Sequence, residues 1–180
     1  MASVCVFCAS SISLDQRWLA LGTEVGAALA ARGHQVVSGG GRVGMMGSVA
    51  EGARSGGAHT IGVIPRVLVA VEVADTGSDE LVVTEDMASR KLAMVDRSDV
   101  FLVLPGGLGT LDELFEVWTT AMLGVHAKPI ILVDVDGFYR GLIEWLAGLV
   151  PLGFVRPQAL SVVRIAGSVA EALDAVDSLR

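Results

Sequence analysis

Residues 100–113 read VFLVLPGGLGTLDE, an apolar run followed by a glycine-rich turn and the beginning of a helical pattern. The run Val100–Leu104 is too short to cross a membrane and is typical of a strand that is buried on both faces. The glycines allow a sharp turn before the helix that we expect over Thr110–Leu123. A strand, a turn and a helix in this order favour an α/β fold.

The same alternation of short β-branched runs and helical patterns extends along the chain. The expected strands are Val4–Phe7, Gln35–Val37, Thr60–Ile64, Leu81–Thr84, Val100–Leu104, Ile130–Val133 and Ser161–Ile165. The expected helices are Asp15–Arg32, Val43–Ser55, Met87–Arg97, Thr110–Leu123, Phe138–Leu149 and Val169–Leu179. This pattern predicts a Rossmann-like, doubly wound, mostly parallel sheet of about seven strands with helices on both faces.

The length of 180 residues favours a single domain over 1–180. One stretch, Arg66–Asp79, lacks clear periodicity, and we expect an irregular loop or a short helix there. In an open sheet of this kind, ligands bind beyond the carboxyl ends of the strands. The residues that follow each expected strand are therefore the candidates for a functional site.

Composition excludes several classes of partner. The net charge is −7, which argues against nucleic acid because binding its backbone requires clustered Lys and Arg. Apolar residues make up 52% of the chain, yet they occur in runs shorter than the roughly 18 residues of a membrane span. The sequence does not open with a secretory signal, so we expect a cytoplasmic protein. The apolar surplus is also consistent with a buried subunit interface.

The turn after Val100–Leu104 has the properties of a phosphate cradle. Gly107 and Gly109 let the backbone approach an anion, and the following helix directs its free N–H groups and its dipole toward that anion. Thr110 can add a hydroxyl group. The turn lacks the Lys of a Walker A loop, so nucleoside triphosphate hydrolysis is not expected.

Glu113 has two interpretations that are not exclusive. A carboxylate in the first part of this helix would face a ligand held at the turn, where it could act as a general base or stabilise positive charge on a sugar. Thr110-x-x-Glu113 is also the spacing of a capping box, which would make both residues structural.

A second glycine-rich run, Gly39–Gly47, follows the expected strand Gln35–Val37. Gly39, Gly41 and Gly44 satisfy the dinucleotide-binding pattern G-x-G-x-x-G, but no acidic residue ends the next strand to hold a ribose hydroxyl. Two alternatives are a glycine-lined wall against which a ligand packs, which we favour, and a tight turn without a ligand.

Arg90 and Lys91 lie near the start of the helix expected over Met87–Arg97, where the helix dipole disfavours cations. They are either a solvated basic pair or contacts to a phosphate or sugar, for which Arg offers a bidentate fork and Lys a point charge. Cys5 and Cys8 are spaced as C-x-x-C without a second ligand pair, so we expect buried, reduced thiols and no metal site. His34, His59 and His126 are scattered, and we interpret them as structural or surface residues.

Residues 105–113 resemble the P-G-G-x-G-T-x-x-E signature of the LONELY GUY family, and Met87-Ala88-Ser89-Arg90-Lys91 is similar to the second signature of that family, Met-x-x-Arg-Lys. The opening Cys5–Ser11 and the run Gly39–Gly47 also fit, so the resemblance covers nearly the whole chain. Members have carried the label "lysine decarboxylase", but no pyridoxal-binding lysine motif is present here.

The resemblance implies hydrolysis of cytokinin riboside 5′-monophosphates, and of AMP, to the free base and ribose 5-phosphate, without a cofactor. It implies Arg90 and Glu113 as catalytic residues. It also implies a homodimer with sites near the interface. The implied substrate contacts are Glu72, Arg90, Lys91, Gly107, Leu108, Gly109, Thr110, Leu111, Asp112, Glu113 and Thr119.

Two other functions are open. A non-catalytic nucleotide or cofactor carrier on the same fold would bind a phosphate-bearing ligand without turnover. A nicotinamide-dependent oxidoreductase would use Gly39–Gly44. The presence of both Arg90 and Glu113 favours the hydrolase.

Overall fold

A computed structural model describes residues 1–69 and 74–178. The strands are β1 (Ser3–Phe7), β2 (Gln35–Ser38), β3 (Thr60–Pro65), β4 (Glu80–Thr84), β5 (Val100–Val103), β6 (Ile130–Val133) and β7 (Val163–Ala166). The α-helices are α1 (Gln16–Ala31), α2 (Gly44–Ser55), α3 (Met87–Asp96), α4 (Leu108–Met122), α5 (Arg140–Gly148), α6 (Pro157–Leu160) and α7 (Val169–Asp177). The strand and helix alternation expected from the sequence is confirmed.

All seven strands pair in parallel in one sheet with the order β4-β3-β2-β1-β5-β6-β7. The chain winds outward from β1 to β4, then returns to the other side of β1 at β5 and winds outward to β7. The predicted doubly wound fold is therefore confirmed. Because the winding direction reverses between β1 and β5, a crevice forms at the carboxyl ends of these two strands.

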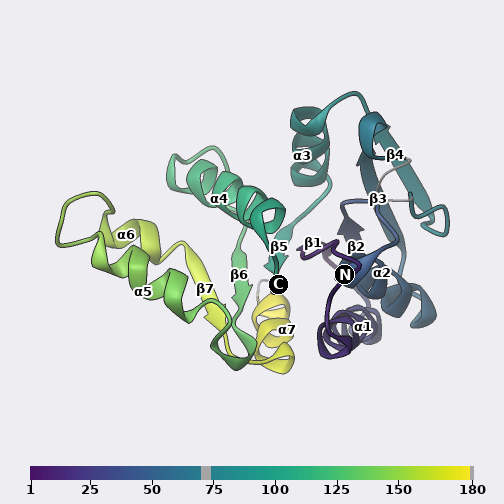
Figure 1. Cartoon of the computed structure of the whole chain (residues 1–180), viewed down its shortest axis with the longest axis horizontal. Coiled ribbons are helices and arrows are strands. Elements are labelled where there is room, and N and C mark those ends of the chain that lie inside the picture. The colour runs from purple at the N-terminus through teal and green to yellow at the C-terminus, as the bar shows by residue number, and fades with distance from the viewer. Residues whose placement is uncertain (70–73, 179–180) are drawn as a thin grey trace.

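Helices cover both faces of the sheet (Figure 1). Val4 and Val6 of β1 point into a core with α1, α2 and α7, whereas Cys5 and Phe7 point into a second core with α3, α4 and α5. Successive residues of a strand face opposite sides, so a strand between two helical layers must be apolar at every position. This requirement explains the continuous apolar runs in the sequence.

The ends of several elements differ from the predictions. The last strand begins at Val163 rather than Ser161, because Pro157 opens the short helix α6, which the prediction missed. Pro is well suited to the first position of a helix. The helix expected over Phe138–Leu149 begins later, at Arg140, because a 3-10 turn over Val135–Gly137 precedes it and Tyr139 is the N-cap of α5.

The predicted helix stop at Gly33 is confirmed, since Gly33 follows the C-cap of α1 with φ +71°. The stretch Arg66–Asp79 begins with a 3-10 helix, Arg66–Leu68, as expected for a loop or a short helix.

Among the described residues, no helix is long and apolar enough to cross a membrane.

Candidate active site

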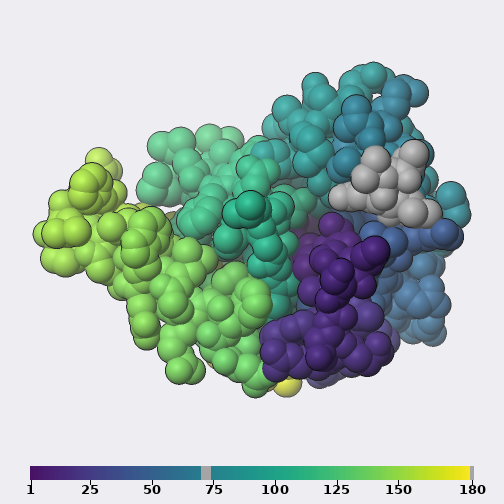
Figure 2. All heavy atoms as spheres, in the orientation of Figure 1, coloured from purple at the N-terminus to yellow at the C-terminus, as the bar shows by residue number. Residues whose placement is uncertain are grey.

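A cavity of about 310 Å³ lies at the crevice between β1 and β5. One wall is the segment that follows β1, and the opposite wall is the start of α4; the two lie side by side in Figure 2, in purple and teal-green. A hydrogen bond of 3.1 Å from Met46 N to Ala9 O fixes the first wall against α2. The lining residues are Cys8, Ala9, Ser10, Ser11, Met46, Leu68, Met87, Arg90, Gly107, Leu108, Gly109, Thr110, Asp112 and Glu113.

The start of α4 differs from the capping box that the sequence allowed. The N-cap is Gly107, and no described side chain caps it, so Thr110 is the third residue of the helix and not its cap. The capping-box interpretation of Thr110 and Glu113 is wrong because the glycine turn brings the chain into the helix before Thr110. Gly107, Leu108 and Gly109 are exposed, and the first-turn N–H groups of the helix are directed toward the cavity.

Arg90 is brought into the cavity by the first turn of α3. Asp86 caps this helix in a capping box with Ser89, which places Arg90 at the fourth helical position. The Arg90 side chain is only 5% exposed, so the solvated interpretation is wrong for this residue. Its Nε donates to Val63 O at 3.1 Å and its Nη2 to Gly39 O at 3.0 Å.

The guanidinium also reaches the carboxylate of Glu113. Arg90 Nη1 lies 3.5 Å from Glu113 Oε1, and the Glu113 side chain is 10% exposed. The two predicted catalytic residues, which come from α3 and α4, thus form a buried ion pair that lines the cavity. Buried charges are costly unless they are paired, so this pair is a candidate for function rather than for stability alone.

The run Gly39–Gly47 contributes Met46 to the cavity wall and contains the positive-φ residues Gly40 and Gly44 of a tight turn, whereas Gly39 has a use that the sequence analysis did not foresee. A Cβ atom added to Gly39 would lie 1.9 Å from Arg90 Nη2. In the structure, the group that packs against Gly39 is therefore Arg90 and not a ligand. Gly44 has a structural reason of its own, because it has φ +62° and a Cβ atom there would lie 2.6 Å from the backbone of Ser10.

Lys91 does not line the cavity but lies at its edge, beside the lining residue Asp112. Its Nζ donates to Asp112 Oδ2 at 3.1 Å and forms an ion pair with Glu116. The hydrogen bond with Glu116 is the main reason that the pKa of Lys91 is raised, despite partial burial. Leu111, on the inner face of α4, packs against the core that α3, α4 and α5 share with the sheet. Substrate contacts by Lys91 and Leu111 stay predictions.

Thr119 lies outside the cavity, in a second and more apolar groove of about 410 Å³ between α4 and the α5–α6 region. Glu72 lies outside the described residues. Thr119 is therefore not brought to the Arg90–Glu113 pair within one chain, and the substrate contacts of Thr119 and Glu72 stay predictions.

Cys5 and Cys8 are buried and unbonded to each other, as expected. Burial, followed by the negative charge of Glu113, raises the pKa of both thiols. Cys8 lines the cavity, but its thiol stays protonated at neutral pH and is a poor nucleophile. Within the described residues, no cluster of His, Cys, Asp and Glu is arranged to hold a metal ion.

The sequence analysis quoted Cys5–Ser11 and Gly39–Gly47 as motifs, but it did not predict that Cys8–Ser11 and Met46 would share one cavity with the glycine turn, and it missed Leu68. Their contribution depends on β5 lying next to β1, which no local pattern encodes. The general rule that ligands bind after parallel strands pointed to the segment after β1, but not to its pairing with the glycine turn.

Comparison with known proteins agrees with the motifs. The family model described as "Possible lysine decarboxylase" matches residues 46–176. A relative from Mycobacterium tuberculosis, named cytokinin riboside 5′-monophosphate phosphoribohydrolase, is 51% identical over 96% of this chain and 92% of its own length. A relative of the same name from Arabidopsis thaliana is 40% identical over 93% of this chain and 79% of its own length.

Among solved structures, the molybdenum cofactor carrier protein of Chlamydomonas reinhardtii superposes with a TM-score of 0.72 at 24% identity, over 99% of this chain and 96% of that one. The molybdenum cofactor binding protein of Rippkaea orientalis gives a TM-score of 0.74 at 23% identity, over 99% and 96%. At this level of identity the likeness shows the fold alone. The family model and the relatives, by contrast, establish that the chain belongs to the LONELY GUY family.

Proposed function

We propose that this protein hydrolyses the N-glycosidic bond of cytokinin riboside 5′-monophosphates and of AMP, and releases the free base and ribose 5-phosphate. The names and identities of the relatives from M. tuberculosis and A. thaliana support this activity. The observation that carries the proposal is the buried pair of Arg90 Nη1 and Glu113 Oε1, 3.5 Å apart on the wall of a cavity that also contains the start of α4.

The substrate phosphate binds at the first turn of α4. The N–H groups that begin a helix have no partners within the helix, and the helix dipole favours a negative group there. Gly107 and Gly109 carry no side chain that would keep a phosphate at a distance, and the hydroxyl of Thr110 lies in the same wall. The binding energy of this remote group holds the glycosidic bond in place near Glu113.

Glu113 acts on the sugar. As the C1′–N bond breaks, its electron pair moves to the base and the sugar gains oxocarbenium character. The Glu113 carboxylate stabilises this positive charge and accepts a proton from the water whose oxygen bonds to C1′. The departing base takes up a proton from solvent water and Glu113 returns its own proton to solvent, which completes the hydrolysis and restores the carboxylate.

Arg90 holds the Glu113 carboxylate in one orientation through their ion pair. A guanidinium does not release its proton at neutral pH, so Arg90 is not the acid that protonates the base. Its Nε and Nη2 are engaged by the carbonyl groups of Val63 and Gly39, which leaves Nη1 directed at Glu113.

The activity is tested by chromatography of the products from AMP, from isopentenyladenosine 5′-monophosphate and from adenosine. We expect free base from both monophosphates. Adenosine lacks the phosphate, and its kcat/KM should be at least about 100-fold lower because the remote binding energy is lost. Absence of free base from both monophosphates would refute the proposal. Equal rates for AMP and adenosine would refute phosphate binding at α4.

We also propose a homodimer formed through the groove that contains Thr119. Phe154 is 80% exposed, Leu123 is 68% exposed and Met122 is 48% exposed, and all three line this groove. Contiguous exposed apolar side chains are typical of an interaction surface. If a second copy bound there, Thr119 of one protomer could contact the substrate held by its partner, which it does not reach within one chain.

Light scattering after gel filtration tests the dimer. We expect twice the mass of 18.7 kDa for the unmodified protein and a monomer for Phe154→Asp. A monomeric unmodified protein would exclude the dimer and, with it, this role for Thr119. The single domain over residues 1–180, the cytoplasmic location and the lack of nucleic-acid binding stay predictions.

A further inference from the structure

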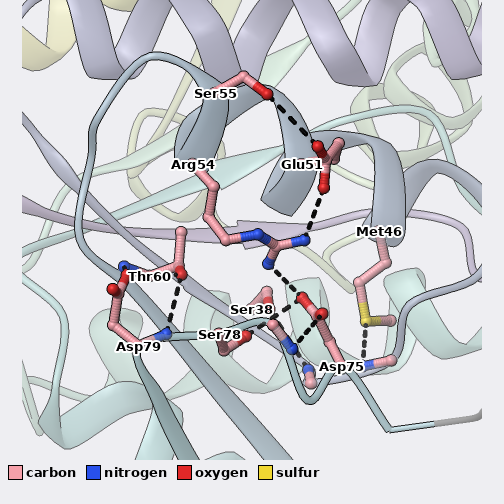
Figure 3. Close-up of polar contacts among 12 residues, drawn as sticks. Ser38, Met46, Glu51, Arg54, Ser55, Thr60, Asp75, Ser78 and Asp79 are labelled. Atoms are coloured by element: carbon pink, nitrogen blue, oxygen red, sulfur yellow. Dashed lines mark hydrogen bonds and ion pairs between the residues drawn. The ribbon is translucent and has the colours of Figure 1, made fainter.

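Asp75 is a buried carboxylate outside the cavity, 4% exposed, and the proposed reaction does not use it. Figure 3 shows the Arg54 side chain of α2 extending to it, with Nη1 donating to Asp75 Oδ2 at 2.6 Å. Ser78 Oγ donates to the same oxygen at 3.1 Å, and Gly77 N donates to Oδ1 at 3.2 Å. Three donors, one of them the Arg54 cation, therefore fix this carboxylate in a single position.

The backbone beside Asp75 is attached to the glycine turn that follows β2. Asp75 N donates to Gly40 O at 2.8 Å, and Ala74 forms an antiparallel bridge with Gly41. Gly40 has φ +75°, and a Cβ atom there would lie 3.0 Å from atoms of Val63 and Ile64. The turn thus packs closely against β3 on one side and is hydrogen-bonded to Asp75 on the other.

The opposite side of the same turn supports Arg90. Gly39 O accepts the hydrogen bond from Arg90 Nη2, and the guanidinium lies so close to Gly39 that no side chain would fit. A shift of the turn must therefore move the guanidinium. Since Nη2 is fixed by Gly39 and Nε by Val63, the turn also sets the direction of Nη1 toward Glu113.

We propose that Asp75, held by Arg54, is a positioning residue that fixes the Gly39–Gly41 turn and thereby aligns Arg90 with Glu113. This role rests on the proposed hydrolase function, because it concerns the rate of that reaction. Misplacement of a reacting group by about 1 Å can reduce a rate by up to about 100-fold. A loss of alignment should therefore appear in kcat more than in KM.

Asp79 provides a matched control on the same segment. Its Oδ2 accepts from Thr60 N at 2.8 Å and from Thr60 Oγ1 at 3.0 Å. Figure 3 shows the third contact of the pair, in which Asp79 N donates to Thr60 Oγ1 at 3.3 Å. Thr60 begins β3, at the end of the strand opposite to the catalytic cavity. Asp79 thus makes hydrogen bonds of similar length from a more exposed side chain, 48% against 5% for Asp75, and Thr60 is not part of the Gly39–Gly41 turn.

The test compares Asp75→Asn and Asp79→Asn, with Arg54→Lys as a milder change at the same contact. We expect Asp75→Asn to lower kcat for isopentenyladenosine 5′-monophosphate about tenfold and to change KM by less than about twofold. Arg54→Lys keeps the charge but loses the fork, and should lower kcat about threefold. Asp79→Asn should lower the thermal midpoint while kcat stays within about twofold of the unmodified protein.

A measurement that needs no turnover accompanies the kinetics. The Nε–H resonance of Arg90 in a ¹⁵N spectrum, assigned by its absence in Arg90→Lys, should shift in Asp75→Asn and Arg54→Lys but not in Asp79→Asn. An unmoved resonance with unchanged kcat in Arg54→Lys and Asp75→Asn would overturn the positioning role, as would an equal loss of kcat in Asp79→Asn. If the unmodified protein released no base, the hydrolase proposal would fail, and the resonance alone would decide whether Asp75 aligns Arg90.

Discussion

Two groups of ion pairs join α3 to α4, and they begin from adjacent residues of α3. Arg90 and Glu113 have side chains 5% and 10% exposed, and they line the cavity. Lys91, Asp112 and Glu116 are 18%, 58% and 35% exposed, and they meet at the edge of the two helices. Successive residues of a helix are rotated by about 100° around its axis, so the neighbouring cations Arg90 and Lys91 face different surroundings.

The comparison indicates which pair the fold maintains for chemistry. An exposed ion pair contributes about 0–1 kcal/mol to stability, because water screens it. A buried pair costs desolvation that packing with apolar side chains would avoid, so its presence beside a cavity is better explained by reactivity. Substitutions made in one group of ion pairs at a time test this difference.

The largest effect is expected for Arg90→Ala. Removing the guanidinium leaves the Glu113 carboxylate with less compensation in a buried site, so kcat should fall by about 10²–10⁴-fold and the free energy of unfolding by about 3 kcal/mol. Product chromatography and urea unfolding measure the two quantities. The double variant with Glu113→Gln should recover part of the stability. A kcat within about threefold of normal would remove Arg90 from the mechanism.

A smaller loss is expected for Gly39→Ala, because the new methyl group would occupy the position of Arg90 Nη2. The guanidinium must move, and we expect kcat to fall about 10–100-fold with little change in KM. Gly33→Ala is a useful control for stability, since Gly33 has φ +71° and nothing within 4 Å of an added Cβ atom. Normal turnover by Gly39→Ala would show that the approach of Arg90 to this turn is not required.

Lys91→Ala should affect turnover much less. We expect an unchanged kcat and a KM that rises by no more than about threefold, because Lys91 Nζ is held by Asp112 and Glu116 at the edge of the cavity. Steady-state kinetics on both monophosphates give these values. A fall in kcat comparable to that of Arg90→Ala would place Lys91 in the chemistry and abolish the contrast.

The smallest effect concerns the cap of α3, which places both cations. Hydrogen bonds from the Ser89 side chain, then from its backbone, lower the pKa of Asp86 below its ordinary value. The folded pKa is thus below the unfolded one, so the stabilisation is present above about pH 4 and is lost as pH falls through the folded pKa. Thermal midpoints from pH 7 to 2 should fall less steeply for Asp86→Asn. Parallel curves would show that this cap contributes nothing to the acid sensitivity.

Much of this arrangement could be predicted from the sequence. Continuous apolar runs gave the parallel sheet, because a strand covered on both faces has no polar positions. The glycine turn and the Arg90 and Glu113 pair were identified from their motifs. Gly33 ended α1 as expected because its positive φ suits a helix terminus.

Other features depend on contacts that the sequence does not encode locally. The Thr110-x-x-Glu113 spacing suggested a cap, but α4 begins at Leu108 since the glycine turn needs no capping side chain. The importance of Gly39 depends on α3 folding over the end of β2, which brings Arg90 across 51 residues of sequence. Likewise, the sequence could not show which of Arg90 and Lys91 enters the cavity, because this depends on which face α3 turns toward the sheet.

The most direct test of the central claim compares Glu113→Gln with Glu116→Gln. Both changes remove one carboxylate from the same helix, but only Glu113 lines the cavity, whereas Glu116 pairs with Lys91. We predict that Glu113→Gln lowers kcat for isopentenyladenosine 5′-monophosphate by about 10³-fold, and that Glu116→Gln stays within about threefold of the unmodified protein. Equal kcat values for the two folded variants would contradict the assignment of the chemistry to the buried pair.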